Sequence, residues 1–261
     1  MRSLNLKTHN WPTIKRVAAI ASRRLGLIAL SAGTLFTGIA PAAFAQYNPP
    51  ADLGLPSRRE PGGTRGGCPT DFTFEPTTVP VDARSLTPLI PQDNHFGQTL
   101  SPYPTFYWYV PAIQAQAAEF VLMDELNNEI YTVKFQIEST EGGVVSLTLP
   151  ENAGMPPLEV NQNYHWYFSL ICDEFDRGTD IFTDGWVRRV ESDLLPSLAD
   201  LPDGSVPAQA NDYAQAGIWY EAFEILAEDR RMQDGISSPE WERLLESVGL
   251  GEYTDVSFLQ Y

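Results

Sequence analysis

The segment of residues 59–69, Arg-Glu-Pro-Gly-Gly-Thr-Arg-Gly-Gly-Cys-Pro, is the first place to look for chemistry. Gly62 and Gly67 have the spacing of the glycines in a phosphate-binding loop. That motif continues with lysine and a hydroxyl residue, and it lies between a strand and a helix. Cys68 and Pro69 stand at those two positions, and the flanking sequence is rich in proline. The pattern argues against a nucleotide site and predicts a flexible arm that carries a cysteine.

The histidines do not match the sequence patterns of hydrolytic enzymes. From residue 46 onward the chain has His95 and His165, without a His-Glu-x-x-His zinc motif or a Gly-x-Ser-x-Gly nucleophile elbow. His95 lies in a polar turn, and His165 lies on the face of its predicted strand opposite Trp166. We therefore expect a loop histidine and a half-exposed strand histidine. We assign no catalytic residue and no cofactor.

The acidic segment Asp173–Asp180 has enough oxygen atoms to hold Ca²⁺. Phe175 and Arg177, however, occupy positions that an EF-hand gives to oxygen ligands. We expect a solvated hairpin loop, with a calcium site as the alternative, and we assign no metal ligand. A glycosidase is a further alternative, but no carboxylate stands alone in an apolar strand, where burial would raise its pKa.

Tyr107 and Tyr109 are the candidates for a binding surface. In the predicted strand Thr105–Val110, alternation places Phe106 and Trp108 on one face and the two tyrosines on the other. Tyrosines on a sheet surface suit a protein partner or a sugar ring. The alternative is that C-terminal helices cover this face.

The residues that precede Gln46 have the pattern of an export leader. A basic start is followed by a run of small and apolar residues from Leu25 to Ala40, and Ala43-Phe44-Ala45 has the small-x-small form of a cleavage site. We expect residues 1–45 to be a signal peptide, cleaved after Ala45, and the protein to be periplasmic or extracellular. The apolar run is short for an anchor, so no stable membrane span is expected after cleavage, with an uncleaved anchor as the alternative. Ser22-Arg23-Arg24 leaves the twin-arginine route open.

Charge narrows the class of partner. Six of the 17 basic residues and none of the 34 acidic residues precede Gln46, so the remaining chain has a net charge of 11 − 34 = −23. Such a chain repels nucleic acid and anionic membranes. We expect no nucleic-acid binding, and a partner that is an envelope or secreted protein.

Cys68 and Cys172 are the two cysteines of the chain. An exported protein meets an oxidising compartment, where an even number of cysteines favours a disulfide. Two buried thiols are the alternative.

Short β-branched and aromatic runs at regular spacing predict a sheet protein over residues 85–190. A hairpin is expected at 124–129, and the length suits an antiparallel immunoglobulin-like or fibronectin III-like β-sandwich. The expected strands are Leu86–Ile90, Thr105–Val110, Ala118–Asp124, Glu129–Phe135, Val144–Leu149, Asn163–Cys172 and Asp180–Val190.

The segment before this sandwich, 46–84, reads as an extended arm rich in proline and glycine, and the segment after it, 191–261, as a helical C-terminal region. A short helix is expected at Asp193–Ala199, and a longer one over 207–232. A second long helix is expected to begin after Ser238, with Pro239 in its first turn and Gly249 at its end. The two long helices would form a helical hairpin.

Five segments occur here in an order that resembles a known family. They are GGTRGGCP, LSPYPTFYWYVP, AEFVLMDELNNEIY, YHWYFSLICD and AGIWYEAFEILA. The order is similar to that of a secreted cyanobacterial family known as domain of unknown function 928. The resemblance covers about Arg58 to Leu250 and brings no known activity, so it carries over no catalytic residue. Cys68 and Cys172 fall where the family pattern has cysteine, which supports the disulfide.

These observations predict an exported, non-catalytic interaction or scaffold protein of the cell envelope or periplasm that binds protein. The alternative is a carbohydrate-binding or envelope-polymer-hydrolysing protein with a site built from loops.

Overall fold

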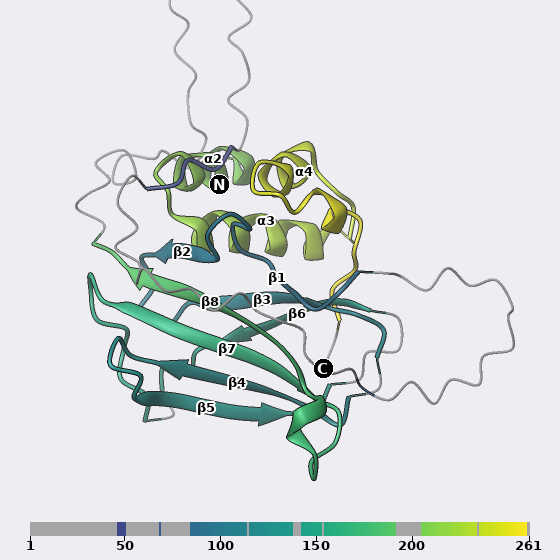
Figure 1. Ribbon diagram of the computed structural model, residues 1–261. Helices are drawn as coiled ribbons and strands as arrows, with labels where there is room; N and C mark the ends of the chain where they lie inside the picture. Colours follow the sequence, from purple (N-terminus) through teal and green to yellow (C-terminus); the bar gives the residue numbers. More distant parts are fainter. Residues whose placement is uncertain are drawn as a thin grey trace, which may run out of the picture. The chain divides into compact units, whose positions relative to one another are not determined.

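The computed structural model describes residues 46–50, 68, 84–113, 115–137, 142–152, 154–191, 205–233 and 235–259 (Figure 1). All of them belong to a unit formed by residues 42–261. The expected signal peptide, most of the expected arm and the short helix expected at Asp193–Ala199 lie outside the described residues.

Two sheets account for the strands of the described chain. One sheet has the order β1-β3-β6 and the other the order β2-β8-β7-β4-β5. The strands are β1 (Thr87–Pro88), β2 (Phe96–Thr99), β3 (Thr105–Val110), β4 (Ala117–Met123), β5 (Glu129–Phe135), β6 (Gly143–Thr148), β7 (Asn163–Ile171) and β8 (Ile181–Arg189).

All seven expected strands are present, within a few residues of their expected bounds. The hairpin at 124–129 is present too, with Asn127 at a φ of 62°. β2 was not expected, and it corrects the antiparallel prediction because it pairs parallel to β8, Phe96 opposite Trp186. Such a pair needs a crossover and cannot be made by a hairpin. The protein is mainly β with two sheets.

The alternating aromatic residues that the sequence assigned to the core form the layer between the two sheets. Trp108 of β3 stacks on Phe168 of β7, with ring centroids 4.1 Å apart. Trp108 also meets Trp166 edge-on at 5.7 Å. Phe106 contacts Phe120 at 5.0 Å, and all five side chains are fully buried. The two sheets therefore pack face to face through interlocking rings.

The helical region differs from the expected hairpin, since its described residues form three α-helices: α2 (Val206–Gln215), α3 (Trp219–Met232) and α4 (Pro239–Glu246). The helix expected over 207–232 is broken at Gly217, which has a φ of +78°. A Cβ there would lie 3.0 Å from the carbonyl oxygen of Asn48. Glycine ends the first helix because it tolerates both the left-handed backbone and this close approach.

The start of α4 is as expected from its sequence. The Ser238 side chain accepts a hydrogen bond from the Trp241 amide at 3.2 Å, and Pro239 is the first helical residue. Gly249 follows the helix with a φ of +81°. Capping residues at both ends therefore fix the limits of this short helix.

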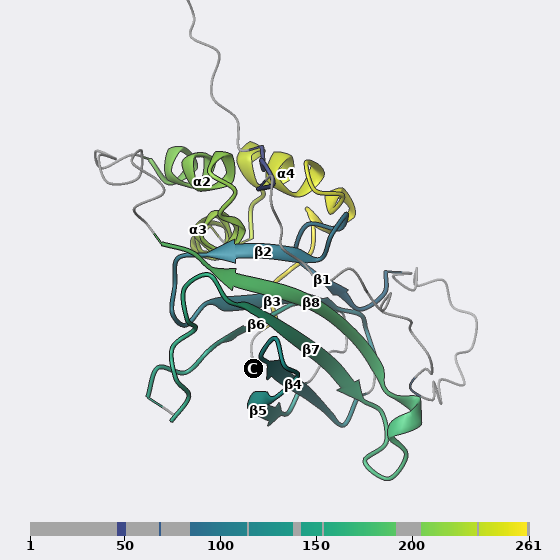
Figure 2. The ribbon, with the colours of Figure 1, turned by 60° about the vertical axis from the view of Figure 1, so that its left-hand side comes forward.

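The helices lie beside β2, at one edge of the five-stranded sheet, with β5 at the other edge (Figures 1 and 2). At Gly97 of β2, a Cβ would meet the Tyr220 ring at 2.7 Å, so glycine permits α3 to approach the strand. Phe223 of α3 contacts Trp241 of α4 at 5.1 Å. Among the described helices, none has the length and apolar character to cross a membrane.

Glu221 of α3 ties the helix to the end of β2. Its Oε1 accepts hydrogen bonds from the Thr99 hydroxyl at 2.7 Å and from the Leu100 amide at 2.7 Å. The Ser101 amide donates to the same oxygen at 3.0 Å. Oε2 is buried without a partner, and burial raises the pKa of this carboxyl above its usual value. The three donors oppose that shift, but burial is the larger effect.

Glu221→Gln is expected to alter how stability depends on pH. A carboxyl whose pKa is raised in the folded state adds stability below its unfolded pKa and loses that contribution as the pH rises through the folded pKa. Glutamine has no such dependence. The free energy of unfolding of the variant, relative to the wild type, should therefore increase as the pH rises above about 4, measured by urea denaturation. Glu228→Gln, at an exposed carboxylate of the same helix, is the control, and equal pH profiles for the two variants would contradict the account.

Candidate functional site

The face of β7 and β8 that points away from the three-stranded sheet carries partly exposed rings, here called the outer row: Trp186, His165 and Tyr167. The His165 ring stacks on Trp186 at 4.2 Å with an interplanar angle of 3°. The Tyr167 ring lies 4.3 Å from that of His165, tilted by 48°. His165 Nε2 is 2.8 Å from Asp184 Oδ2, and both side chains are 12% exposed. The outer row thus packs ring against ring, and the contact between His165 and Asp184 helps to hold it.

A histidine oriented by an aspartate is part of a hydrolytic triad, which also needs a nucleophile. Within the described residues, no serine, threonine or cysteine side chain hydrogen-bonds the other ring nitrogen of His165. A sugar ring binds an aromatic side chain through a free ring face, but stacking already covers one face of Trp186 and one of His165. The arrangement therefore supports rigid packing more than acyl transfer or sugar stacking.

The loop of residues 173–180 joins β7 to β8 and extends beyond the ends of these strands (Figures 1 and 2). We call it the Phe175 loop. The Phe175 amide donates to Asp173 Oδ1 at 2.8 Å, and the Gly178 amide donates to Asp176 Oδ1 at 3.1 Å. The Asp176 amide donates to the Asp173 carbonyl at 3.2 Å. Aspartate side chains thus close two consecutive turns within the loop.

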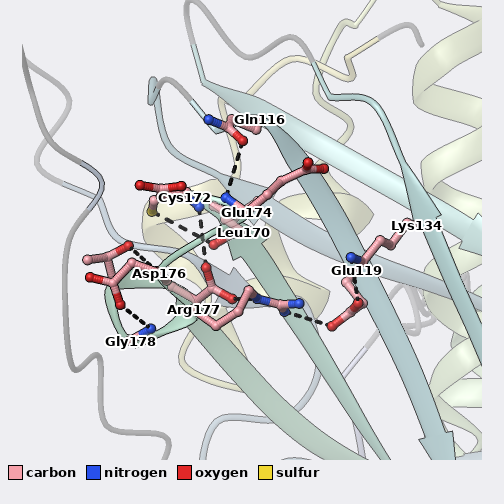
Figure 3. Close-up of polar contacts among 12 residues, drawn as sticks. Gln116, Glu119, Lys134, Leu170, Cys172, Glu174, Asp176, Arg177 and Gly178 are labelled. Carbon is pink, nitrogen blue, oxygen red and sulfur yellow. Dashed lines mark hydrogen bonds and ion pairs between the residues drawn. The ribbon is translucent and has the colours of Figure 1, made fainter.

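Arg177 fastens the loop to the sheet (Figure 3). Its Nη2 lies 2.8 Å from Glu119 Oε2 on β4, and its Nε pairs with Asp180. The hydrogen bond from Arg177 holds the pKa of Glu119 below its usual range, and Lys134 Nζ, 3.6 Å from Glu119 Oε1, acts in the same direction. The loop is therefore tied by charge to the strand on the far side of β7.

The disulfide expected between Cys68 and Cys172 is formed, and both residues are buried. Cys172 directly precedes the Phe175 loop, and its amide donates to Asp180 Oδ1 at 3.3 Å. The Glu174 amide donates to Gln116 Oε1, also at 3.3 Å (Figure 3). The base of the loop is thus fixed by a covalent bond and by hydrogen bonds.

Phe175 itself is 98% exposed. Its loop is held by hydrogen bonds, an ion-pair network and a disulfide at its base, yet the ring contributes almost nothing to the core. Leu126, which is 80% exposed, lies in the β4–β5 hairpin, beyond the other end of β4. The two residues provide a matched pair of apolar side chains on ordered turns.

Residues 60–258 match the family model described as Domain of Unknown Function (DUF928). The chain belongs to this family. No curated protein matches it. Since the family description names no activity, the function of this DUF928 chain has to be inferred from its geometry.

In this DUF928 chain, Tyr107 and Tyr109 do not form an exposed surface. Tyr107 is 4% exposed, and its ring lies 4.9 Å from Phe223 of α3. Tyr109 is 1% exposed and lies 5.1 Å from Tyr253. The C-terminal region covers this face of β3, which is the alternative that the sequence left open.

The calcium alternative receives no support from the geometry of the Phe175 loop. The guanidinium of Arg177 lies between Glu119 and Asp180 and already brings a positive charge to these carboxylates. Over the described ranges, no group of three or more His, Cys, Asp or Glu side chains could hold a metal ion.

Sequence reasoning missed two features of the site. It considered Phe175 only as an absent calcium ligand, although a large apolar side chain within a run of acidic residues was a visible signal. It also did not pair His165 with Asp184. Strand register brings them together, since Tyr167 lies opposite Asp184 and His165 is two residues from Tyr167 on the same face.

Proposed function

We propose that this is an exported, non-catalytic interaction protein of the cell envelope or periplasm, of the secreted cyanobacterial type, and that it binds another protein through the Phe175 loop. The observation that carries the proposal is a fully exposed phenylalanine on a loop fastened by Arg177 and by the disulfide at Cys172. Aromatic side chains that fill a pocket of the partner often contribute a large part of the binding free energy.

The energetics favour Phe175 as an anchor. Burial of a phenylalanine side chain contributes about 1.5–3 kcal/mol. A mobile loop would lose part of this gain as ordering entropy on binding. Here Asp173 and Asp176 close the turns, and Arg177 holds the loop to Glu119. Because the loop is ordered before binding, most of the burial energy remains available for affinity.

The charges around Phe175 define the chemistry of the partner. Asp173, Glu174 and Asp176 flank Phe175 in the sequence. Arg177, the one cation of the loop, is paired with Glu119 and Asp180. The matching surface is an apolar pocket with a rim of lysine or arginine on an envelope or exported protein. Such complementarity accelerates association and is weakened by salt.

The two alternatives receive less support. Carbohydrate binding would use free aromatic faces, but in the outer row His165 stacks on Trp186 and packs against Tyr167, and Phe175 is a single exposed ring on its loop. Hydrolysis of an envelope polymer would need a nucleophile or a pair of carboxylates at a cleft, and the hydrogen bond of His165 in the described chain is to Asp184, which is not a nucleophile of this kind.

Phe175→Ser is expected to weaken partner capture strongly. The chain from Gln46 onward would be immobilised and exposed to the exported protein fraction, and retained proteins would be measured by quantitative mass spectrometry. We expect one partner to be retained by the wild type and by Leu126→Ser, with at least about a tenfold loss for Phe175→Ser, which corresponds to about 1.4 kcal/mol. Retention should decrease as salt is raised.

Equal retention by Phe175→Ser and wild type would contradict the proposal, as would an equal loss with Leu126→Ser. If the wild type retained glycan and no protein, the protein-binding function would be lost and carbohydrate binding would take its place.

A further inference from the structure

Residues 46–48 are bound to the helices from the opposite end of the chain. Tyr47 is 6% exposed, and its ring packs edge-on against Trp219 at 5.2 Å. Its hydroxyl donates to the Gly217 carbonyl at 3.3 Å, and its amide donates to Ser247 Oγ at 3.2 Å. This one residue therefore contacts the α2–α3 turn and the start of α3 through its side chain, and the end of α4 through its backbone amide.

The neighbours of Tyr47 add hydrogen bonds to the end of α2. The Asn48 amide donates to the Ala214 carbonyl at 3.0 Å, and Asn48 Nδ2 donates to the Gln215 carbonyl at 3.4 Å. Gln215 Nε2 in turn donates to the Gln46 carbonyl at 3.1 Å. The last carbonyls of a helix have no partner within the helix, so this segment caps α2.

The bond expected to be cleaved during export, Ala45–Gln46, directly precedes this bound segment. In the cleavage, water adds across the peptide bond and leaves a carboxylate on Ala45 and an amine on Gln46. A peptidase must hold the residues on both sides of that bond in an extended form. In the folded chain, the carbonyl of Gln46 and the ring of Tyr47 are already engaged by the helices.

We infer that the Ala45–Gln46 bond is cleaved before the helices close around Tyr47, and that folding with the leader attached protects the bond. The inference rests on the proposed export of the protein. It favours a route that carries the chain unfolded. On the twin-arginine route, which carries folded proteins, cleavage would come after Tyr47 has been buried.

The expected slowing of cleavage in the folded chain depends on how often the segment around Tyr47 detaches from the helices. For cleavage of the folded chain, Tyr47 must leave the Trp219 ring and the bonds to Gly217, Ser247 and Gln215 must break. When opening and closing are faster than cleavage, the rate scales with the fraction of open molecules. We expect the folded chain to be cleaved at least about tenfold more slowly than an unfolded substrate.

The test uses the full chain with its leader, folded in detergent micelles with the disulfide formed, and a purified signal peptidase. The unfolded reference is a synthetic peptide of residues 1–52, which has the same leader and cleavage sequence without the helices. The new amino terminus at Gln46 would be quantified by mass spectrometry. Gln215→Ala removes a contact to Gln46 without changing the cleavage sequence and should accelerate cleavage of the folded chain. Gln233→Ala, at the exposed end of α3, should have no effect.

The outcomes separate this inference from the proposed function. Slow cleavage of the folded chain, fast cleavage of the peptide and acceleration by Gln215→Ala would support it. If the folded chain and the peptide were cleaved at the same rate, the inference would be wrong and the proposal of export would stand. If neither were cleaved at Ala45–Gln46, the expected leader and the export proposal would both fail.

Discussion

Trp108→Ala is expected to lower the free energy of unfolding by about 3–5 kcal/mol. The indole is fully buried between the sheets, stacked on Phe168 at 4.1 Å and edge-on to Trp166 at 5.7 Å. Truncation of the indole removes the free energy of its burial and its contacts with the neighbouring rings. It also leaves a cavity that the neighbouring strands cannot fill. Urea denaturation followed by circular dichroism measures the change, with the denaturant slope expected to stay constant.

Phe175→Ala is the matched control for Trp108→Ala. It also removes a large aromatic ring, but one that is 98% exposed, so the free energy of unfolding should change by less than about 0.5 kcal/mol. A Trp108→Ala variant within about 1 kcal/mol of the wild type would show that the interlocking rings do not hold the two sheets together.

Loss of the disulfide is expected to have the second largest effect on stability. Cys68 and Cys172 are 104 residues apart, so the bond closes a large loop and restricts the unfolded chain. In the chain-entropy model, such a loop contributes up to about 4–5 kcal/mol. The double variant Cys68→Ser, Cys172→Ser should lose a comparable amount, measured by urea denaturation.

A reducing agent provides the control for the disulfide. It should lower the stability of the wild type to that of the double variant and leave the double variant unchanged. Peptide mapping without reduction should recover one cross-linked pair from the exported protein. Free thiols at both positions would contradict the account.

The strands could be predicted because their signal is local. In Tyr164–Leu170, buried rings and a leucine alternate with His165, Tyr167 and Ser169, and the same alternation in Thr105–Val110 identified Phe106 and Trp108 as core residues. A strand with one buried face needs this period of two. The capping pattern of α4 is local as well, and it too was readable.

Other features of the fold depend on contacts that no local pattern contains. β2 has only four residues, Phe-Gly-Gln-Thr, and its parallel partner β8 lies far along the chain. The break at Gly217 had a visible signal in the glycine itself, but the apolar spacing on both sides favoured one continuous helix. The close approach of Asn48 to that glycine comes from the other end of the described chain.

The candidate site was predicted in part. The sequence identified the disulfide and the acidic loop, but it could not show that Arg177 reaches Glu119 on β4, a contact between residues 58 positions apart. The exposure of Phe175 is likewise a consequence of how the loop is fastened. For Tyr107 and Tyr109, the alternation of side chains correctly predicted which face of the strand they share. It could not predict that the C-terminal region covers that face.

The central claim is that the Phe175 loop binds a protein, and site-specific photo-cross-linking tests it most directly. Benzoylphenylalanine would replace Phe175 in one form of the chain and Leu126 in another, and each form would be illuminated in the exported fraction. We predict one defined protein adduct from position 175, weakened by salt, and no such adduct from position 126. No protein adduct at position 175, or the same adducts from both positions, would contradict the claim.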